Sequence, residues 1–433
     1  MTTKGSVEVI TENLESHPHC PHGPTILFSR EVKGKKRNFF ACSACRDRKH
    51  CNFFLWEDER NKLTKFKKRK LFLIMNQIRN LSPERRIYCH ICSEFVLENF
   101  ENKHTNHSSL KGISNYQLDH PSEILPALED TKKEAQYLFS KASIETLVNI
   151  FKTLGYKNVI CIGTPRIHEY IRSSCEDMNS ILLDIDCRFH NFFGPLEYCW
   201  YNMFNDYFFF NEAKTVFEDF LKCNRAEGMV LIIDPPFGGR VEPLAFTLNK
   251  LNHQYKSLNK LKKDLPIFWI FPYFMEPQIL NSLSNFRMLD YKVEYDNHLL
   301  FQDGPKGRKQ GSPVRIFTNV NPSLIRLPDN GYTYCRPCNR WVSEENNHCD
   351  LCNSCTSKDG RTYVHCSTCM RCVKPTWKHC KQCGRCAQVE HKCDCFHCKE
   401  SGHKKSECPL LKQLSCKKRK NHMKKNKSKK MRK

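Results

Sequence analysis

The chain has 433 residues, including 27 cysteines, and its 70 lysines and arginines against 46 aspartates and glutamates give a formal charge of +24. This length predicts two to four domains of roughly 100–200 residues each. No apolar run reaches the roughly 18 residues that a membrane span needs, and the first twenty residues lack the apolar segment of a secretory signal. We therefore expect an intracellular protein whose C-x-x-C pairs bind metal. The cationic excess favours a polyanionic partner, most often nucleic acid, over a basic protein that is merely soluble.

Residues 1–60 combine cysteines with closely spaced aromatic residues, in the order Cys-x-His, Phe-Phe-Ala-Cys and Cys-Asn-Phe-Phe-Leu-Trp. This order resembles the GRF-type zinc finger, in which four ligands hold zinc among packed aromatic side chains. The resemblance implies the ligands Cys20, His22, Cys42 and Cys51. Cys45 is an additional thiol, so the choice between Cys42 and Cys45 is open.

Fingers of the GRF type commonly engage single-stranded nucleic acid. In this chain Lys35, Lys36 and Arg37 directly precede the aromatic residues. Aromatic side chains that stack on bases and cations that contact phosphates would together bind such a strand. The alternative is a zinc-held module that docks a protein.

Residues 61–111 begin with a basic stretch, Lys62 to Lys70, and end in a compact cluster of cysteines and histidines. In this cluster, Cys-x2-Cys is followed after eleven residues by His-x2-His, one residue tighter than the usual second pair of a C2H2 finger. Two tight pairs joined by a short loop can close a tetrahedron around zinc. We therefore predict a C2H2-type finger after a basic linker, with the ligands Cys89, Cys92, His104 and His107.

Residues 112–326 have no paired cysteines and alternate apolar runs with helical patterns. Continuous apolar runs suit strands that are covered on both faces, and their alternation with helices predicts an α/β fold with a parallel sheet. The predicted strands are residues 159–163, 181–185, 229–233 and 267–271, with a helix at 212–222 and a final antiparallel hairpin at 291–295 and 314–318.

The third predicted strand runs directly into Asp234-Pro235-Pro236-Phe237. This edge of a parallel sheet faces the ligand crevice, and the two prolines make the turn rigid. The carboxylate and the turn carbonyls can accept hydrogen bonds from an exocyclic amine, while Phe237 can stack on a flat base for about 1–3 kcal/mol. Such a site would act on an amino-bearing heterocycle, mainly by positioning and electrostatics. The alternative is an ordinary proline turn with a capping aspartate.

The motif resembles the D/N-P-P-Y/F/W motif of class I S-adenosylmethionine-dependent amino-methyltransferases, which act on adenine N6, cytosine N4 or some glutamines and lysines. The resemblance implies a Rossmann-like domain with S-adenosylmethionine across the strand ends. It also implies that the catalytic residues are Asp234, Pro235, Pro236 and Phe237.

The same resemblance suggests the cofactor contacts. Asp184 is the first choice for the ribose hydroxyls, and Asp186 is the second choice, with a helix-capping role as its alternative. Gly163 is a single glycine where the family has two or three, and Arg166 would pair with the cofactor carboxylate. Core packing or loop structure is the alternative for each contact. The remaining candidates are Gln136, Tyr137, Leu138, Phe139, Phe204, Asn205 and Asp234.

Residues 330–393 contain the pattern C-x2-C-x9-H-C-x2-C-x2-C twice in succession. This spacing predicts structural zinc sites and resembles the cysteine-rich domain of DHHC palmitoyltransferases. The sequence lacks the Asp-His-His-Cys core of those enzymes, so the resemblance implies only a zinc scaffold without catalysis. It suggests interleaved sets: Cys335, Cys338, His348 and Cys355; Cys349, Cys352, His365 and Cys372; Cys366, Cys369, His379 and Cys386; Cys380, Cys383, His391 and Cys393.

Two short segments close the chain. Residues 394–409 have the spacing of a CCHC zinc knuckle, which commonly binds single-stranded RNA loops. Its ligands would be Cys395, Cys398, His403 and Cys408. Residues 417–433 are mostly Lys and Arg without apolar periodicity, so we expect a disordered tail. This tail would act as a nuclear or nucleolar address and an RNA contact, or simply as a solvated charge run.

The full order of modules is similar to that of the CCHC zinc-finger ribosomal RNA adenine-N6 methyltransferases, over nearly the whole chain. The resemblance implies methyl transfer from S-adenosylmethionine to N6 of an unpaired adenosine in large-subunit ribosomal RNA, structural zinc ions, and a location in the nucleus and nucleolus, with the cytoplasm left open. One alternative is an amino-methyltransferase of DNA or protein. The other is a zinc-rich RNA-binding or assembly factor with an inactive methyltransferase fold, which the single glycine at 163 would favour.

Overall fold

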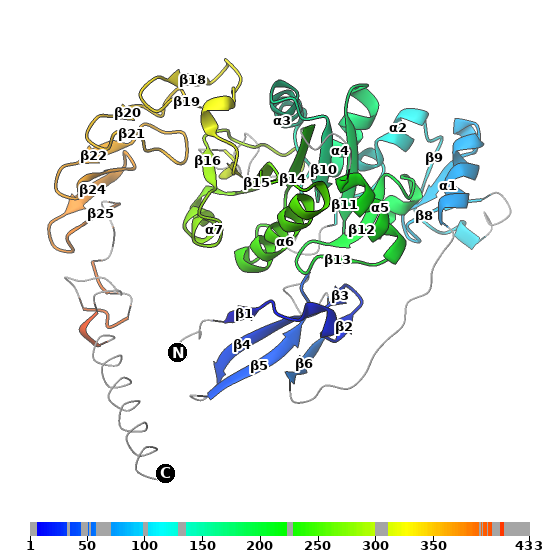
Figure 1. Ribbon diagram of the computed structural model, residues 1–433, viewed down its shortest axis with the longest axis horizontal. Coiled ribbons are helices and arrows are strands. Elements are labelled where there is room, and N and C mark those ends of the chain that lie inside the picture. Colours follow the sequence, from blue (N-terminus) through cyan, green and yellow to red (C-terminus); the bar gives the residue numbers. More distant parts are fainter. Residues whose placement is uncertain are drawn as a thin grey trace, which may run out of the picture. The chain divides into compact units, whose positions relative to one another are not determined.

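The computed structural model divides the chain into two compact units, Met1–Pro328 and Asp329–Lys433 (Figure 1). The basic stretch Lys62 to Lys70, the residues Cys45 and His403, and the tail 417–433 lie outside the described residues. The structure describes residues 7–32, 35–44, 51, 53–57, 71–97, 103–128, 136–222, 228–298, 311–388, 391, 393–395, 397–400 and 408–410.

The first unit is built on an eight-stranded sheet of order β13-β12-β11-β10-β14-β15-β17-β16, parallel from β12 to β15. Every residue of β10, β14 and β15 is buried, which explains their continuous apolar sequences. The four predicted strands are all present. The parallel strands are β10 (Asn158–Ile162), β11 (Asn179–Asp184), β12 (Tyr198–Asn202), β14 (Met229–Ile233) and β15 (Ile267–Pro272).

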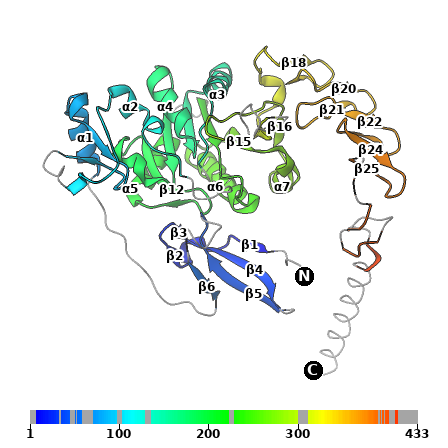
Figure 2. The same cartoon turned by 180° about the vertical axis from the view of Figure 1, so that it is seen from behind.

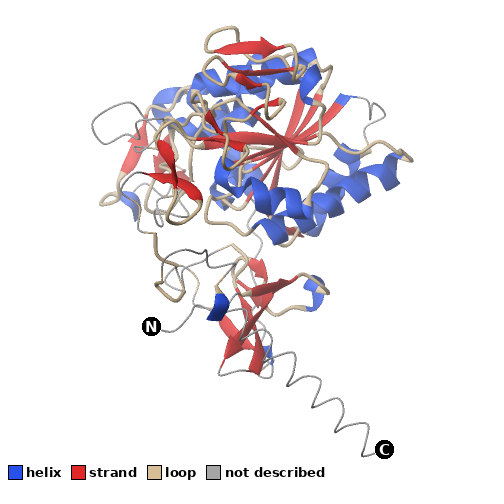
Figure 3. Ribbon diagram, turned by 90° about the vertical axis from the view of Figure 1, so that its left-hand side faces the viewer, coloured by secondary structure: helices blue, strands red, loops and turns tan. Residues whose placement is uncertain are grey.

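Helices cover both faces of this sheet, as the edge-on view of the sheet shows (Figure 3). Helix α4 connects β10 to β11 and α6 connects β14 to β15, as crossovers between parallel strands require. Helix α5 confirms the predicted helix at 212–222. The helices are α3 (Lys141–Thr153), α4 (Pro165–Ser174), α5 (Asn211–Leu221), α6 (Val241–Asn259) and α7 (Glu276–Ser282), with the short η5 (Pro121–Glu123), η6 (Cys187–Asn191), η8 (Tyr273–Met275) and η9 (Pro322–Leu324).

The antiparallel edge of the sheet differs from the prediction. Strand β17 (Val314–Thr318) pairs with β15 and with β16 (Arg287–Leu289), while residues 291–295, all of them described, form no regular strand. The predicted hairpin was therefore wrong in its first strand. Its apolar alternation has another cause, because Tyr291, Val293 and Tyr295 are buried in an extended segment beside α3.

The N-terminal finger contains a four-stranded antiparallel sheet of order β1-β4-β5-β6 (Figure 2). It belongs to the first unit and shares a core with the α/β domain, since Leu14 and Ile26 lie in the same buried cluster as Ile160 and Phe204. Its elements are β1 (Glu8–Ile10), η1 (Leu14–Ser16), β2 (His19–Cys20), β3 (Gly23–Pro24), β4 (Ile26–Val32), β5 (Lys35–Ala41) and β6 (Phe54–Trp56).

The second finger is a three-stranded sheet of order β8-β7-β9 with flanking helices. Its Tyr88 ring packs on Phe192 of the α/β domain, with ring centroids 5.7 Å apart. The elements of this finger are α1 (Leu71–Asn80), η3 (Pro83–Arg85), β7 (Ile87–Cys89), β8 (Glu94–Val96), β9 (Ser109–Lys111) and α2 (Asn115–Asp119). The edge strand of the central sheet next to β12 is β13 (Tyr207–Phe208). Among the described residues no helix is both long and apolar enough to cross a membrane.

The described part of the second unit contains four successive antiparallel hairpins. The aliphatic side chains buried among its described residues are Val342 and Val373, and most other buried positions are cysteines. So small an apolar core cannot hold the hairpins by itself. The strands are β18 (Tyr332–Cys335), β19 (Arg340–Ser343), β20 (His348–Cys349), β21 (Ser354–Cys355), β22 (Val364–Cys366), β23 (Arg371–Val373), β24 (Trp377–Cys380) and β25 (Arg385–Gln388).

Candidate active site and metal centres

The turn after β14 lies against the turn after β10. The backbone N–H of Asp234 donates to the Ile162 carbonyl oxygen at 3.1 Å. Gly163 has φ 65°, and a Cβ atom there would lie 3.0 Å from the Asp234 carbonyl oxygen and 2.9 Å from Met203 Cε. The single glycine therefore permits a close approach of the two turns that another residue would obstruct.

A cavity of about 230 Å³ opens where these strands end. It brings together residues that the sequence analysis assigned separately to catalysis and to cofactor binding. Those that line it are Gln136, Tyr137, Gly163, Asp184, Asp186, Phe204, Asp234, Pro235, Pro236 and Phe237. Several wall residues were not predicted to belong to the cofactor or catalytic site, namely His22, which was predicted only as a zinc ligand, and Ala44, Leu128, Ile185, Asn202 and Met203.

Four of the predicted cofactor contacts are not among the described residues that line the cavity. Leu138 and Phe139 are buried, and Asn205 donates its amide to the Pro24 carbonyl oxygen. Arg166 donates from Nη1 to the Phe139 carbonyl oxygen at 2.9 Å and pairs with the carboxylate of Asp296. Its predicted contact with a cofactor carboxylate stays a prediction. The contacts that Arg166 makes hold the segment before α3 in place.

The two acids after β11 have different surroundings. Asp186 accepts two hydrogen bonds from the Arg188 guanidinium, at 2.8 and 2.7 Å, and caps η6 through the Arg188 backbone N–H. Asp184 Oδ1 accepts from the Asp186 backbone N–H at 2.9 Å. Burial, with the Asp186 charge nearby, raises the pKa of Asp184 to about 7. The capping role of Asp186 is observed, and the contact of Asp184 with the ribose hydroxyls stays a prediction.

The pKa of Asp184 predicts how cofactor affinity depends on pH. In the predicted cofactor site, ribose hydroxyls would donate to the ionised carboxylate of Asp184, so protonation of the free protein would compete with binding of S-adenosylmethionine. We expect the Kd to rise about tenfold between pH 8 and pH 6, because a group with a pKa of about 7 changes from mostly ionised to mostly protonated over that range. Calorimetry on wild type and Asp184→Asn checks this. The same pH dependence in both proteins would contradict it.

Asp234 is held by a residue that the sequence analysis missed. The Tyr295 hydroxyl donates to the Asp234 carboxylate, 3.1 Å from each oxygen. Burial raises the pKa of Asp234 well above its usual range, and the Tyr295 hydrogen bond partly opposes this. Burial next to Asp234 likewise raises the pKa of Tyr295. The only sign of a buried role for Tyr295 in the sequence was the alternation of aromatic and aliphatic residues at 291–295, and that pattern resembled a strand.

Aromatic rings surround the turn after β14. Tyr137 stacks on Phe237 with centroids 5.4 Å apart and an interplanar angle of 27°, and it contacts the His298 ring at 4.2 Å. Phe139 stacks on Tyr295 at 5.1 Å. Tyr137 therefore covers one face of Phe237, the ring predicted to stack on the substrate base.

The predicted zinc ligands of both N-terminal fingers converge. In each finger, one ligand atom from every residue lies within 4.8 Å of the others. Three thiols with one imidazole, or two with two, suit a closed tetrahedral zinc site. The sets are Cys20, His22, Cys42 and Cys51 in the first finger and Cys89, Cys92, His104 and His107 in the second.

The second unit brings together the interleaved sets that the sequence suggested. In three of these sets, as in the fingers, one ligand atom from every residue lies within 4.8 Å of the others. In the fourth, the Cys383 and Cys393 thiols lie 3.2 and 3.3 Å from His391 Nε2, and Cys380 Sγ lies 3.5 Å from Cys393 Sγ. The first three sets are Cys335, Cys338, His348 and Cys355; Cys349, Cys352, His365 and Cys372; Cys366, Cys369, His379 and Cys386.

Adjacent residues in this unit belong to successive sites. His348 precedes Cys349, His365 precedes Cys366, and His379 precedes Cys380, so each site is directly bonded to the next. In the CCHC knuckle, Cys395 and Cys408 are buried and Cys398 is half-buried, whereas His403 is outside the described residues. The domain boundaries given above remain predictions.

Comparison with known proteins identifies the family. The family model described as probable N6-adenine methyltransferase matches residues 130–321, and the GRF zinc finger model matches residues 18–60. The chain is 45% identical over 427 residues to rRNA N(6)-adenosine-methyltransferase ZCCHC4 of Homo sapiens, covering 91% of this chain and 83% of that protein. It is 48% identical over 427 residues to the Mus musculus protein of that name (91% and 83% covered), and 48% over 429 to the one from Xenopus laevis (92% and 88%). The chain therefore belongs to the family of the rRNA N(6)-adenosine-methyltransferases named ZCCHC4.

Proposed function

We propose that this chain transfers a methyl group from S-adenosylmethionine to N6 of an adenosine in ribosomal RNA. The observation that carries the proposal is the cavity in which Asp234 to Phe237 face Asp184 across the turn at Gly163. A buried carboxylate at the end of β11 and a close turn after β10 fit a nucleoside cofactor. When bound, S-adenosylmethionine supplies the electrophilic methyl group.

The chain's own residues orient the amine. The Asp234 carboxylate and the Pro235 carbonyl would accept the two N6 hydrogens, which directs the nitrogen lone pair away from the turn. Tyr295 fixes the Asp234 carboxylate through its hydroxyl, 3.1 Å from both oxygens. Phe237 would support the base by stacking. The target adenosine must be unpaired or extruded, because N6 is engaged inside a duplex.

A second cavity, of about 260 Å³, adjoins the first and shares Ala44, Phe204 and Pro236 with it. Phe28, Phe39 and Arg240 also line it. Aromatic faces with a guanidinium suit the bases and phosphates of a single strand. This continuity supports an RNA path from the catalytic turn onto the first finger, and it favours RNA over a protein amine as substrate.

A substitution of Arg37 tests this RNA path. The Arg37 guanidinium lies 3.9 Å from the centroid of the Trp56 ring, and Arg37 stands two positions before Phe39 on the same face of β5. Arg37→Ala should weaken RNA binding several-fold and reduce the salt dependence by about one phosphate contact. Lys141→Ala is the matched control, because it removes the same charge from α3, a helix outside the first finger. Equal losses in both variants, measured by fluorescence anisotropy over a salt series, would argue against the path.

The reaction is tested by methyl transfer from labelled S-adenosylmethionine to total RNA, with nucleoside analysis of the product. N6-methyladenosine in large ribosomal RNA that disappears with Asp234→Ala supports both the reaction and the site. Methylation of DNA or of protein amines alone would refute the RNA assignment.

We also propose a nuclear and nucleolar location. The support is the basic tail 417–433 in the sequence. Imaging of the chain with and without this tail in cells tests it. The same distribution for both would refute an address in the tail.

A further inference from the structure

The first zinc finger forms part of the wall of the methyltransferase cavity. His22 and Ala44 line this cavity together with Asp184 and Asn202. His22 is also one of the four ligands that converge in the finger. One residue therefore belongs to both a metal site and the cavity that we assign to the cofactor.

Asn202, at the end of β12, connects the finger to the cavity. Its side chain is buried, and Nδ2 donates to the His22 carbonyl oxygen and to Ser43 Oγ, both at 2.7 Å. Its Oδ1 accepts from the Phe204 backbone N–H at 3.0 Å. One amide thus links the two ligand-bearing loops of the finger to the turn whose residues Met203 and Phe204 line the cavity.

Further close contacts surround this link. Asn205 Nδ2 donates to Ser43 Oγ at 3.3 Å as well as to the Pro24 carbonyl oxygen. Gly23 has φ 92°, and a Cβ atom there would lie 2.5 Å from Tyr207 Cδ1. The ligand loops of the finger therefore lie directly on the turn 202–207.

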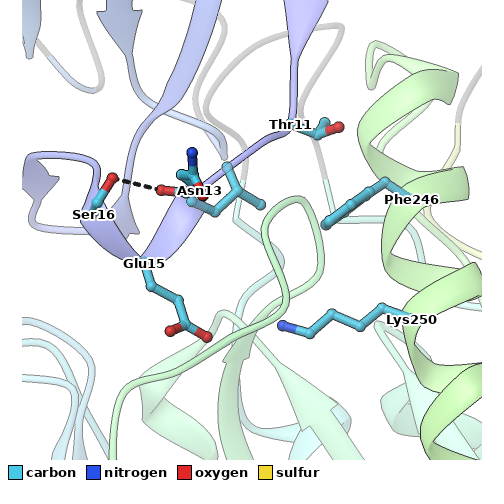
Figure 4. Close-up of a pocket in the computed structure, with 7 residues that line it drawn as sticks. Thr11, Asn13, Glu15, Ser16, Phe246 and Lys250 are labelled. Atoms are coloured by element: carbon cyan, nitrogen blue, oxygen red, sulfur yellow. Dashed lines mark hydrogen bonds between the residues drawn. The ribbon is translucent and has the colours of Figure 1, made fainter.

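Beside this link and the shared apolar core, one part of the contact between finger and domain is open. A cavity of about 420 Å³ separates the finger segment Thr11 to Ser16 from α6, whose Phe246 and Lys250 side chains extend towards it (Figure 4). Lys250 Nζ pairs with Asp206 at 2.9 Å, so the domain holds the far side of the same turn. The position of the turn on the finger side depends mainly on the ligand loops.

Those loops contain little regular secondary structure. Strands β2 and β3 contain two residues each, and the thiols Cys20, Cys42 and Cys51 form a separate buried cluster that packs only on Ala44 and Phe53 among the described apolar residues. A bound zinc ion would fix these thiols and the His22 imidazole at bonding distance. Metal binding would in this way set the positions of the His22 carbonyl and of Ser43.

We infer that zinc in the first finger determines the affinity of the chain for S-adenosylmethionine, through Asn202. The zinc site would then serve the cofactor cavity as well as any RNA contact of the finger. The inference rests on the proposed function only in taking the cavity as the cofactor site. It does not depend on which RNA is methylated.

The test is a calorimetric titration of S-adenosylmethionine into the full chain without RNA, together with metal analysis. Cys51→Ser removes a ligand that does not line the cavity, and it should lower the zinc content by one ion and raise the Kd by about tenfold or more. Ser43→Ala keeps all four ligands, so it should keep its zinc and raise the Kd by about fivefold through the loss of a hydrogen-bond acceptor. If Cys51→Ser does not fold, the Kd of Ser43→Ala still tests the inference.

Glu8→Gln is the control on the surface of the same finger, and it should change neither the zinc content nor the Kd. A Cys51→Ser protein that has lost its zinc and still binds S-adenosylmethionine within about twofold of wild type would overturn the inference. So would an unchanged Kd in Ser43→Ala. Zinc-dependent cofactor binding without methylation of ribosomal RNA would leave the inference standing while the proposed substrate fails. Wild type that binds no S-adenosylmethionine would overturn both.

Discussion

Asp234→Ala is expected to lower kcat for methyl transfer by on the order of 10³-fold, which corresponds to about 4 kcal/mol of transition-state stabilisation. The substitution removes the acceptor that orients N6, and it leaves the Tyr295 hydroxyl without the carboxylate it binds at 3.1 Å. Single-turnover assays at saturating RNA measure the loss. The Kd for S-adenosylmethionine should change much less than kcat.

Tyr295→Phe is the matched variant, because it retains Asp234 and removes only the hydroxyl. It should lower kcat by about tenfold with little change in the KM for RNA, as expected for a positioning residue. Full activity in Asp234→Ala would exclude the turn as the catalytic site. A larger loss in Tyr295→Phe than in Asp234→Ala would reverse the roles assigned to the two residues.

Removal of zinc should unfold the second unit completely while the α/β sheet remains folded. The described part of this unit buries the aliphatic side chains Val342 and Val373, whereas every residue of β10, β14 and β15 is buried. Structural zinc contributes roughly 10–16 kcal/mol of apparent folding free energy per site in small domains. Hydrogen exchange of the full chain with and without a chelator should show protection lost over 331–388 and retained in the central strands.

Restoring zinc should restore this protection, which controls for irreversible damage. Cys349→Ser should have an effect beyond its own site, because His348 and Cys349 belong to neighbouring sites. Protection that persists over residues 331–388 in chelator would show that the hairpins are held by something other than metal.

Most of the fold could be predicted from local patterns in the sequence. The apolar runs at 159–163 and 229–233 match β10 and β14 because strands buried on both faces need apolar residues at every position. The sets of zinc ligands could also be predicted, since the ligands of each set lie close together in the sequence. The alternation at 291–295 gave the wrong result because burial on one side of an extended segment produces the same period as a strand.

The composition of the cavity could not be predicted in full. His22 meets Asn202, and Tyr295 meets Asp234, only because distant segments pack together. Neither His22 nor Tyr295 carries a local signal for such a contact: the spacing around His22 predicts a zinc ligand, and Tyr295 belongs to a strand-like pattern. When one module contributes a single residue to a site in another module, the position of that residue is set by tertiary packing. The periodicity of the sequence contains no information on such packing.

The shared backbone of the four zinc sites has a consequence for how this region can change length in evolution. Each of the first three sites takes its first two thiols from one hairpin and its histidine and last thiol from the next hairpin. Loss of residues 349–365 would place Cys372 at the same distance after His348 that Cys355 now occupies, so every remaining site would still have four ligands. Deletions and duplications of one whole repeat, from one Cys-x2-Cys pair through the following histidine, therefore preserve the scaffold, whereas a deletion that removes some ligands of a site and keeps the others leaves an incomplete metal site.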